Sequence, residues 1–96
     1  MTKKQTYVYI LSNATNVAVY VGVTSNLKRR VLEHKTKSTP GFAERYGIDK
    51  LVYYEVADDP YSAISREKTL KGSSRARKNG LVESMNPDWR DLYDDI

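Results

Sequence analysis

The sequence predicts an α/β fold of the α+β type, in which a small three-stranded antiparallel sheet is flanked by helices. Two observations carry this prediction. Three short segments are rich in β-branched and aromatic residues, and helix-capping signals follow the second and third of them. Because 96 residues can build only one sizeable core, we expect a single domain over residues 1–96, with an acidic C-terminal tail at residues 83–96.

The strands are expected at three places. Tyr7–Leu11 and Val17–Val23 are separated by the polar residues 12–16, which predicts an antiparallel hairpin. Leu51–Val56 has the same β-branched and aromatic composition and supplies the third strand.

Capping residues mark where helices begin and end. Asp59 before Pro60 is typical of a helix start, because a carboxylate caps the helix and proline suits its first position. Ser25 or Asn26 can cap an earlier helix in the same way. The expected helices cover Leu27 to about Lys35, Phe42 to Tyr46, Pro60 to about Lys71 and residues 75–85, with residues 39–41 as a loop.

Polar side chains fall on helix faces that we expect to be apolar. Arg30 and His34 lie on the stripe that Leu27 and Val31 define. Glu67 falls within an apolar arc drawn through Ile64, Tyr61 and Leu70. A buried carboxylate is costly unless a cation, a metal or a strong donor meets it. Either these groups form a functional site, or Arg30 and Glu67 simply form an ion pair at the rim of the core.

The second strand directs a tyrosine to the same place. Alternation puts Tyr20 between the small residues Ala18 and Gly22, where its hydroxyl is accessible, and hairpin pairing can bring Tyr9 beside it. The opposite face of this strand is expected to be core and carries Val17, Val19, Val21 and Val23.

The charge is unevenly distributed. Residues 1–82 carry fifteen basic and seven acidic side chains, a net of +8, whereas residues 83–96 carry a net of −4. A basic body with eight tyrosines favours a polyanionic partner such as a nucleic acid, although a solvated basic surface explains it equally well. The candidate phosphate-backbone contacts are Lys28, Arg29, Arg75, Arg77 and Lys78.

Several classes of protein are excluded or disfavoured. One histidine and no cysteine exclude a Cys/His or multi-histidine zinc site, and no P-loop motif is present. The longest apolar runs are five residues, far short of the roughly 20 that span a bilayer. With no apolar stretch for a signal peptide either, we expect a cytoplasmic protein that does not enter a membrane.

In order along the chain, these residues resemble the GIY-YIG nuclease signature. Tyr7-Val8-Tyr9 and Tyr20-Val21-Gly22 are similar to its two halves, and Asn26 to Arg30 with His34 is similar to its following helix. Glu67 resembles its metal-binding glutamate, and Asn86-Pro87 with Trp89 resembles its closing motif. The resemblance extends over nearly the whole chain, which is similar to the small single-domain bacterial YhbQ-like members.

The resemblance implies roles for these residues. It implies that Glu67 binds Mg²⁺ or Mn²⁺, that Arg30 holds the scissile phosphate and that Tyr20 is the general base. Because a phenol has a reference pKa of about 10, this needs a cation beside the phenolate or a proton acceptor such as His34. Tyr9 would bind a phosphate oxygen or the attacking water. Asn86 would orient the site or fix the last helix against it, and Gly22 would have a structural role.

The chain departs from the family pattern at two positions. Tyr7 stands where the first motif has its name-giving glycine, and Val23 stands where some relatives have a lysine. The leading hypothesis is a metal-dependent DNA endonuclease, a monomer or weak homo-oligomer, that acts on a broad or structure-defined substrate in DNA repair or processing. The alternative is a nucleic-acid-binding module that keeps the fold without useful turnover, and a protein-interaction domain accounts poorly for the basic body.

Overall fold

The computed structural model describes residues 5–38 and 41–96 and contains the predicted three-stranded antiparallel sheet. Strand β1 (Thr6–Ser12) lies between β2 (Val19–Thr24) and β3 (Lys50–Ala57), so the strand order is β2-β1-β3. The predicted hairpin and third strand are therefore confirmed. Residues 39 and 40 of the expected loop lie outside the described residues.

Two helices begin at predicted capping residues, Asn26 and Asp59, and a third begins after Ser74. The side chains of Asn26, Asp59 and Ser74 each accept a hydrogen bond from a backbone N–H in the first turn of the helix that follows. A short 3₁₀ helix near the C-terminus was not predicted from the sequence. The helices are α1 (Leu27–Lys35), α2 (Phe42–Arg45), α3 (Pro60–Lys71), α4 (Arg75–Met85) and η1 (Tyr93–Asp95).

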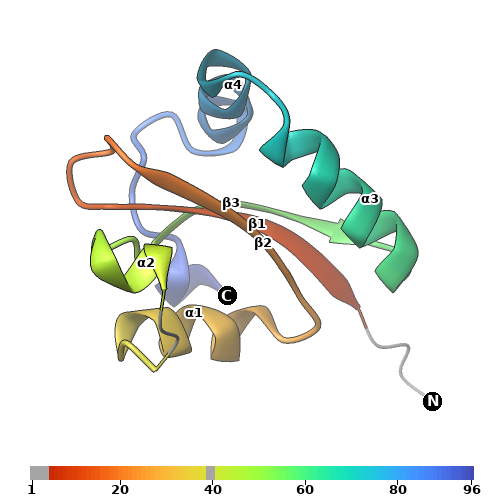
Figure 1. Ribbon diagram of the computed structural model, residues 1–96, viewed down its shortest axis with the longest axis horizontal. Helices are drawn as coiled ribbons and strands as arrows, with labels where there is room; N and C mark the ends of the chain where they lie inside the picture. The colour runs from red at the N-terminus through yellow and green to blue at the C-terminus, as the bar shows by residue number, and fades with distance from the viewer. Residues whose placement is uncertain (1–4, 39–40) are drawn as a thin grey trace.

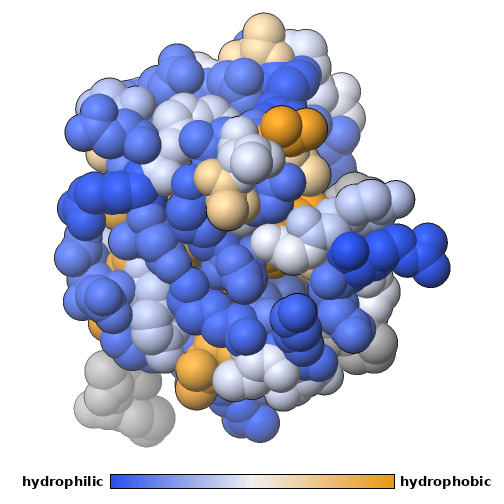
Figure 2. Space-filling model, turned by 90° about the vertical axis from the view of Figure 1, so that its left-hand side faces the viewer, coloured by the Kyte–Doolittle hydropathy of each residue, from blue (hydrophilic) through white to orange (hydrophobic). Residues whose placement is uncertain are grey.

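The helices cover both faces of the sheet. Helices α1 and α2 and the C-terminal segment lie on one side, and α3 and α4 lie on the other (Figure 1). Alternation along β1 sends Val8 and Ile10 into the cluster below α3 and α4, and Tyr9 and Leu11 into the cluster below α1. All four side chains are fully buried, which makes β1 the centre of the molecule. The face shown in Figure 2 is mainly hydrophilic, with apolar side chains scattered over it.

Two predicted core faces are wrong in detail. Val17 precedes β2 and is 71% exposed, so the apolar row of this strand is confined to Val19, Val21 and Val23. In α3, Ile64 and Tyr61 are 44% and 85% exposed. The face of α3 that is buried instead carries Ala63 and Leu70.

This rotation leaves Glu67 near the buried face of α3. Glu67 follows Ala63 by four residues and precedes Leu70 by three, so it lies on the same side of the helix. The carboxylate sits at the edge of the buried face, with 21% of its side chain exposed.

Two side chains hold the acidic tail to the rest of the fold. Trp89 is buried against the core. Asp91 accepts hydrogen bonds from the backbone N–H groups of Leu51 and Tyr93 at 3.2 and 3.0 Å and pairs with Lys35. This carboxylate therefore fastens the C-terminal segment to β3 and α1.

Candidate active site

The hairpin brings the two signature tyrosines together on the α1 face of the sheet. In the β1–β2 register Tyr9 is opposite Gly22 and Tyr20 is opposite Leu11, so the tyrosines are diagonal neighbours with ring centroids 6.4 Å apart. A Cβ atom at position 22 would lie 2.5 Å from both Cζ and the hydroxyl oxygen of Tyr9. Gly22 is thus required because the ring of Tyr9 lies across the backbone of β2 at this point.

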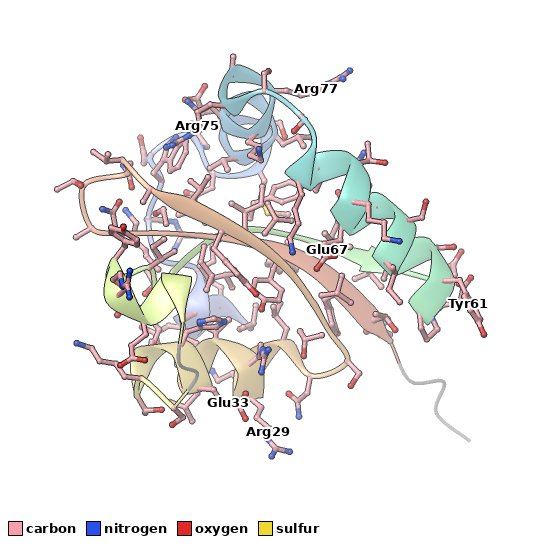
Figure 3. The ribbon with its side chains drawn as sticks, in the orientation of Figure 1. Arg29, Glu33, Tyr61, Glu67, Arg75 and Arg77 are labelled. Atoms are coloured by element: carbon pink, nitrogen blue, oxygen red, sulfur yellow. The ribbon has the colours of Figure 1, made fainter. Side chains whose placement is uncertain are left out.

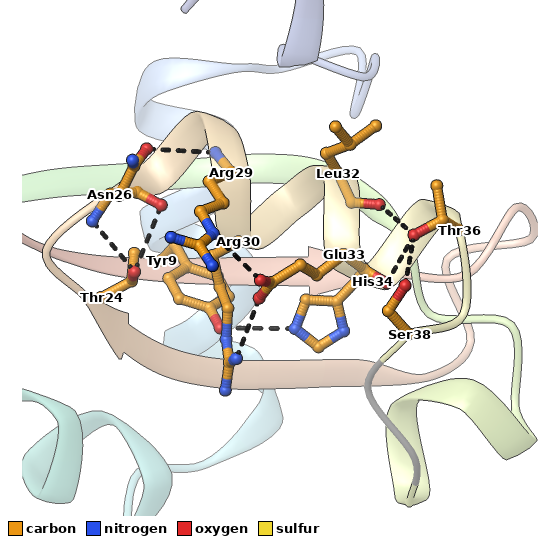
Figure 4. Close-up of polar contacts among 10 residues, drawn as sticks. All are labelled: Tyr9, Thr24, Asn26, Arg29, Arg30, Leu32, Glu33, His34, Thr36 and Ser38. Carbon is orange, nitrogen blue, oxygen red and sulfur yellow. Dashed lines mark hydrogen bonds and ion pairs between the residues drawn. The ribbon is translucent and has the colours of Figure 1, made fainter.

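Helix α1 adds His34 beside both phenols. The His34 ring centroid is 5.5 Å from that of Tyr20 and 6.2 Å from that of Tyr9, and the side chain is buried. The Tyr9 hydroxyl lies 3.4 Å from Nε2 of His34, a long hydrogen bond (Figure 4). Two aromatic hydroxyls and an imidazole therefore share one small region at the β2 edge of the sheet.

The surroundings set the protonation states of two of these groups. Burial raises the pKa of Tyr9 to about 12, and the guanidinium of Arg30 opposes this rise only in part. Burial and the positive charge of Arg30 lower the pKa of His34 below its ordinary value of 6.5. At neutral pH Tyr9 is therefore a protonated donor, and His34 is an uncharged imidazole that can accept a proton at its free nitrogen.

Arg30 reaches this region from α1 and is incompletely paired. Its Nη1 donates to Glu33 at 3.2 Å, and its guanidinium is close enough to Tyr9 to lower the pKa of that phenol. Its Nε is buried and has no hydrogen-bond partner among the described residues. A buried N–H without an acceptor is costly, so a ligand oxygen would be stabilised by Nε if the Arg30 side chain turned to expose it.

Glu67 approaches the same region from α3. Its negative charge contributes to the raised pKa of Tyr9, and its side chain points from α3 towards the strands (Figure 3). Its ion-pair partner is Lys71 at 3.5 Å, whereas Arg30 pairs with Glu33. The alternative of a simple Arg30–Glu67 ion pair is thus not what the structure contains.

Lys71 is a member of the site that the sequence analysis missed. Its Nζ lies 5.8 Å from the centroid of the Tyr20 ring and 3.5 Å from a carboxylate oxygen of Glu67. The only sequence signal was its place one helical turn after Glu67. Lys71 thus brings an ammonium group to the site, whereas position 23, where some relatives have a lysine, is a valine in this chain.

A polar groove gives access to Arg30. It has a volume of about 210 Å³ and runs between the end of β2 and the first turns of α1. The residues lining this polar groove are Val23, Thr24, Ser25, Asn26, Arg29, Arg30 and Glu33.

The donor set fits a hard cation bound through few protein ligands. Among the residues that the structure describes, no group of three His, Asp or Glu side chains converges as a complete metal cage. Mg²⁺ retains several waters and is commonly held by one or two carboxylates plus substrate phosphates. Glu67, the carboxylate of α3 that acts on Tyr9, is therefore a sufficient protein ligand for such an ion.

The structure does not bring Asn86 to these residues. This buried side chain ends α4, on the opposite face of the sheet, where it donates to the carbonyls of Val52 and Arg90 at 3.2 and 2.7 Å and accepts from the Arg90 N–H. These bonds agree with the second role considered for Asn86, because its amide fixes the end of α4 to β3 and to the tail.

Three of the five candidate phosphate contacts hold the protein's own backbone. Arg75 donates to the carbonyls of Val17 and Asn16, both at 2.6 Å, and so clamps the β1–β2 turn. Lys28 donates to the C-terminal residue Ile96 at 3.0 Å, and Lys78 donates to a carbonyl at the start of α4.

The other two candidates remain available to a ligand. Arg29 is exposed and makes only a surface pair with Glu33 at 3.3 Å. Arg77 projects away from the sheet at the outer side of α4 (Figure 3). Within the described part of the chain, these two of the predicted nucleic-acid contacts have guanidinium groups that do not hold the protein's own backbone.

Comparison with known proteins identifies the class of fold and site. Residues 5–80 match the model of the GIY-YIG catalytic domain. The chain therefore belongs to the GIY-YIG nuclease family.

Its similar proteins are small members of this family. A UPF0213 protein of Natronomonas pharaonis is 38% identical over 76 residues, covering 79% of this chain and 88% of that protein. One from Clostridium perfringens is 35% identical over 80 residues, covering 83% and 85%. The solution NMR structure of the UPF0213 protein BH0048 from Bacillus halodurans has a TM-score of 0.57 and 25% identity, and covers 92% of this chain and 93% of that one. No helix in the described part of the chain has the length and apolarity needed to cross a bilayer.

Proposed function

We propose that this chain is a divalent-metal-dependent endonuclease that hydrolyses phosphodiester bonds in DNA and works as a single domain over residues 1–96. The observation that carries the proposal is the convergence of five side chains from both sides of the β2 edge. They are Tyr9, Tyr20, Arg30, His34 and Glu67.

Arg30 is proposed to hold the scissile phosphate. A planar guanidinium can make two parallel hydrogen bonds to phosphate oxygens and neutralise their charge. The buried Nε without a partner and the opening of the polar groove beside Arg30 support this role. Arg29 lines the same polar groove and would add a second positive charge along the DNA backbone.

Tyr20 is proposed to take the proton from the attacking water. His34, whose lowered pKa keeps its ring uncharged at neutral pH, lies beside Tyr20 and would accept the phenolic proton of Tyr20 as Tyr20 takes the proton of the water. Lys71 would stabilise negative charge on the phenol oxygen during this step. Tyr9 stays protonated because its pKa is about 12, so it would donate a hydrogen bond to a phosphate oxygen.

Glu67 is proposed to hold Mg²⁺ or Mn²⁺. When bound, the ion would supply Lewis-acid neutralisation of the phosphate and of the leaving oxygen. Lys71 now pairs with Glu67 at 3.5 Å, so this ammonium would have to turn towards Tyr20 for the carboxylate to become free.

Cleavage assays test the proposal. Purified protein is incubated with supercoiled plasmid, single-stranded DNA and branched DNA, in Mg²⁺ or in chelator. We expect metal-dependent cleavage that is lost in both Tyr20→Phe and Glu67→Ala, and preference for branched DNA would point to a role in repair or processing. Binding without cleavage of any substrate would contradict the proposal and would establish a DNA-binding module instead.

A further inference from the structure

A second cleft lies on the α1 face of the sheet. It has a volume of about 400 Å³ and lies between the start of α1 and the ends of β1 and β3. Its walls are mostly apolar and aromatic, with one ammonium group at the rim. We call it the tyrosine cleft; its principal lining residues are Tyr7, Tyr54, Val56, Leu27, Asn26 and Lys28.

The tyrosine cleft adjoins the polar groove that contains Arg30. Ser25 and Asn26 line both depressions, so a ligand strand that follows a path around the first turn of α1 would contact both. The protein surface changes character along this path. At the Arg30 end it is polar and cationic, and at the other end two tyrosines and Val56 make it apolar and aromatic.

The side chains of the tyrosine cleft are accessible and partly unused. Tyr7 and Val56 are cross-strand neighbours, and Val56 is 53% exposed although it lies within a strand. Within residues 5–38 and 41–96, the hydroxyls of Tyr54 and Ser25 have no hydrogen-bond partner. An open aromatic pocket with free hydroxyls at its wall fits a flat ring that carries polar atoms on its edge.

We propose that the tyrosine cleft receives one unpaired nucleobase of the DNA strand whose phosphate lies at Arg30. This inference rests on the proposed function, because it takes Arg30 as the phosphate site. A nucleotide offers an anionic group and a flat aromatic group linked together, which matches the two ends of the path. Aromatic side chains bind bases of any sequence, since every base has a π-face.

The occupant defines the class of substrate. A base that is stacked and paired in a duplex cannot enter a pocket in a protein surface, so it must leave the stack first. Unpaired nucleotides, such as bulges, flaps and single strands, have already met most of this cost. The tyrosine cleft thus favours DNA with an unpaired base beside the scissile phosphate.

The test is a binding measurement that does not depend on cleavage. The full chain is titrated, in chelator, with three short duplexes that are identical except at one position. One carries a single bulged 2-aminopurine, one carries an abasic bulge and one is fully paired. We expect the bulged base to bind about 5- to 150-fold more tightly than the abasic bulge, which is the range for stacking one base on aromatic side chains. Its fluorescence should change on binding.

Matched variants localise the effect. Tyr54→Leu removes the aromatic face but keeps an apolar side chain, so it should abolish most of the difference between the base and the abasic bulge. Tyr54→Phe keeps the ring and should retain the difference. Tyr7→Leu tests the opposite wall and serves if Tyr54→Leu does not fold, with thermal unfolding as the check on each variant.

Distinct outcomes separate this inference from the proposed function. Equal affinity for the base and the abasic bulge, or a difference that both leucine variants keep, would overturn the pocket whether or not the protein cleaves DNA. Self-association that the leucine variants abolish, without any effect on DNA, would also overturn it, because a second copy would then cover the cleft. The expected binding pattern supports the pocket even in a protein that cleaves nothing.

Discussion

Two clusters built from the same residue types differ in how completely their polar groups are paired. The paired cluster consists of Tyr53, Glu55 and Arg66 and joins β3 to α3. There Arg66 donates to both carboxylate oxygens of Glu55, at 2.7 and 3.4 Å, and the Tyr53 hydroxyl donates to the same carboxylate.

The open cluster consists of Tyr9, Arg30 and Glu67 and lies between α1 and α3. Its phenol makes a long 3.4 Å contact with His34, its carboxylate pairs with Lys71 at 3.5 Å and its guanidinium has a buried Nε without a partner among the described residues. Polar networks that are fully satisfied rigidify a fold, whereas unsatisfied ones require another explanation.

The pKa values of the tyrosines do not separate the two clusters. Burial is the main cause in both, and the pKa of Tyr9 and of Tyr53 is raised to about 12. What separates them is the pairing of the guanidinium and the carboxylate. We therefore expect a phenol, a guanidinium and a carboxylate that lie near one another to form a site where their hydrogen-bonding capacity is left for a ligand.

The largest expected difference comes from removing one arginine from each cluster. Arg30→Ala should slow cleavage by about 10²-fold or more, because the group that neutralises the phosphate is lost, and should change the free energy of unfolding by less than about 0.5 kcal/mol. Arg66→Ala should lower the free energy of unfolding by about 1–2 kcal/mol, because the Glu55 carboxylate loses its cationic partner, with cleavage by the folded protein nearly unchanged. Urea unfolding and initial cleavage rates measure both; a stability loss in Arg30→Ala larger than in Arg66→Ala contradicts the comparison.

The next largest effect is expected at Gly22. A methyl group there would displace the Tyr9 ring, so Gly22→Ala should lower the free energy of unfolding by about 1–3 kcal/mol and slow cleavage by about 10²-fold. Gly80 in α4 is the control, because a Cβ there meets nothing within 4 Å. Gly80→Ala should stabilise the protein by about 0.5–1 kcal/mol and leave cleavage unchanged. A Gly22→Ala protein with unchanged stability and cleavage would contradict this, because it would show that the Tyr9 ring can move without affecting either.

Much of the fold is predictable because its determinants are local. Asp59 with Pro60, Asn26 before Leu27 and the alternation along β1 each specify an element through neighbours in the sequence. The helix or strand face that carries Arg30, His34 or Tyr20 could also be predicted, because the periodicity of the surrounding residues defines that face.

The rest depends on tertiary packing. Periodicity did not show that α3 buries Ala63 rather than Ile64, because both choices give an amphipathic helix. The contact of Lys71 with Tyr20 and the clamp from Arg75 to the β1–β2 turn join residues 51 and 58–59 positions apart. No local signal in a single sequence separates a lysine or arginine that binds its own chain from one that is free for a ligand.

The two regions should also titrate in different pH windows. The pKa of His34 is lowered in the folded state, so below about pH 6.5 the unfolded chain binds more protons and the free energy of unfolding falls. Burial raises the pKa of Glu55, but the hydrogen bonds from Arg66 and Tyr53 outweigh it and lower the net value below 4.5, so this contribution is lost only in more acidic solution. Urea unfolding is measured at a series of pH values. His34→Gln should reduce the pH dependence of the free energy of unfolding only in the less acidic window, and Glu55→Gln only in the more acidic one. Equal curves for both variants would refute the assignment.

The smallest effect is expected from the surface cations. Arg77→Ala should weaken DNA binding a few-fold on all sequences alike and reduce the slope of log affinity against log salt by about 1, as expected for one phosphate contact. Arg75→Ala should instead lower stability, because Arg75 holds the β1–β2 turn, and should leave the salt slope unchanged. Fluorescence anisotropy at several salt concentrations distinguishes them, and a sequence-selective loss in Arg77→Ala would mean that this side chain reads bases.

The most direct test of the central claim compares the two glutamates. Glu67→Gln and Glu55→Gln remove the same charge from the open and the paired cluster. Single-turnover cleavage in Mg²⁺ should slow by about 10²-fold or more in Glu67→Gln and by less than about threefold in Glu55→Gln. Equal rates for the two variants, in folded protein that cleaves DNA, would contradict the assignment of the open cluster as the active site.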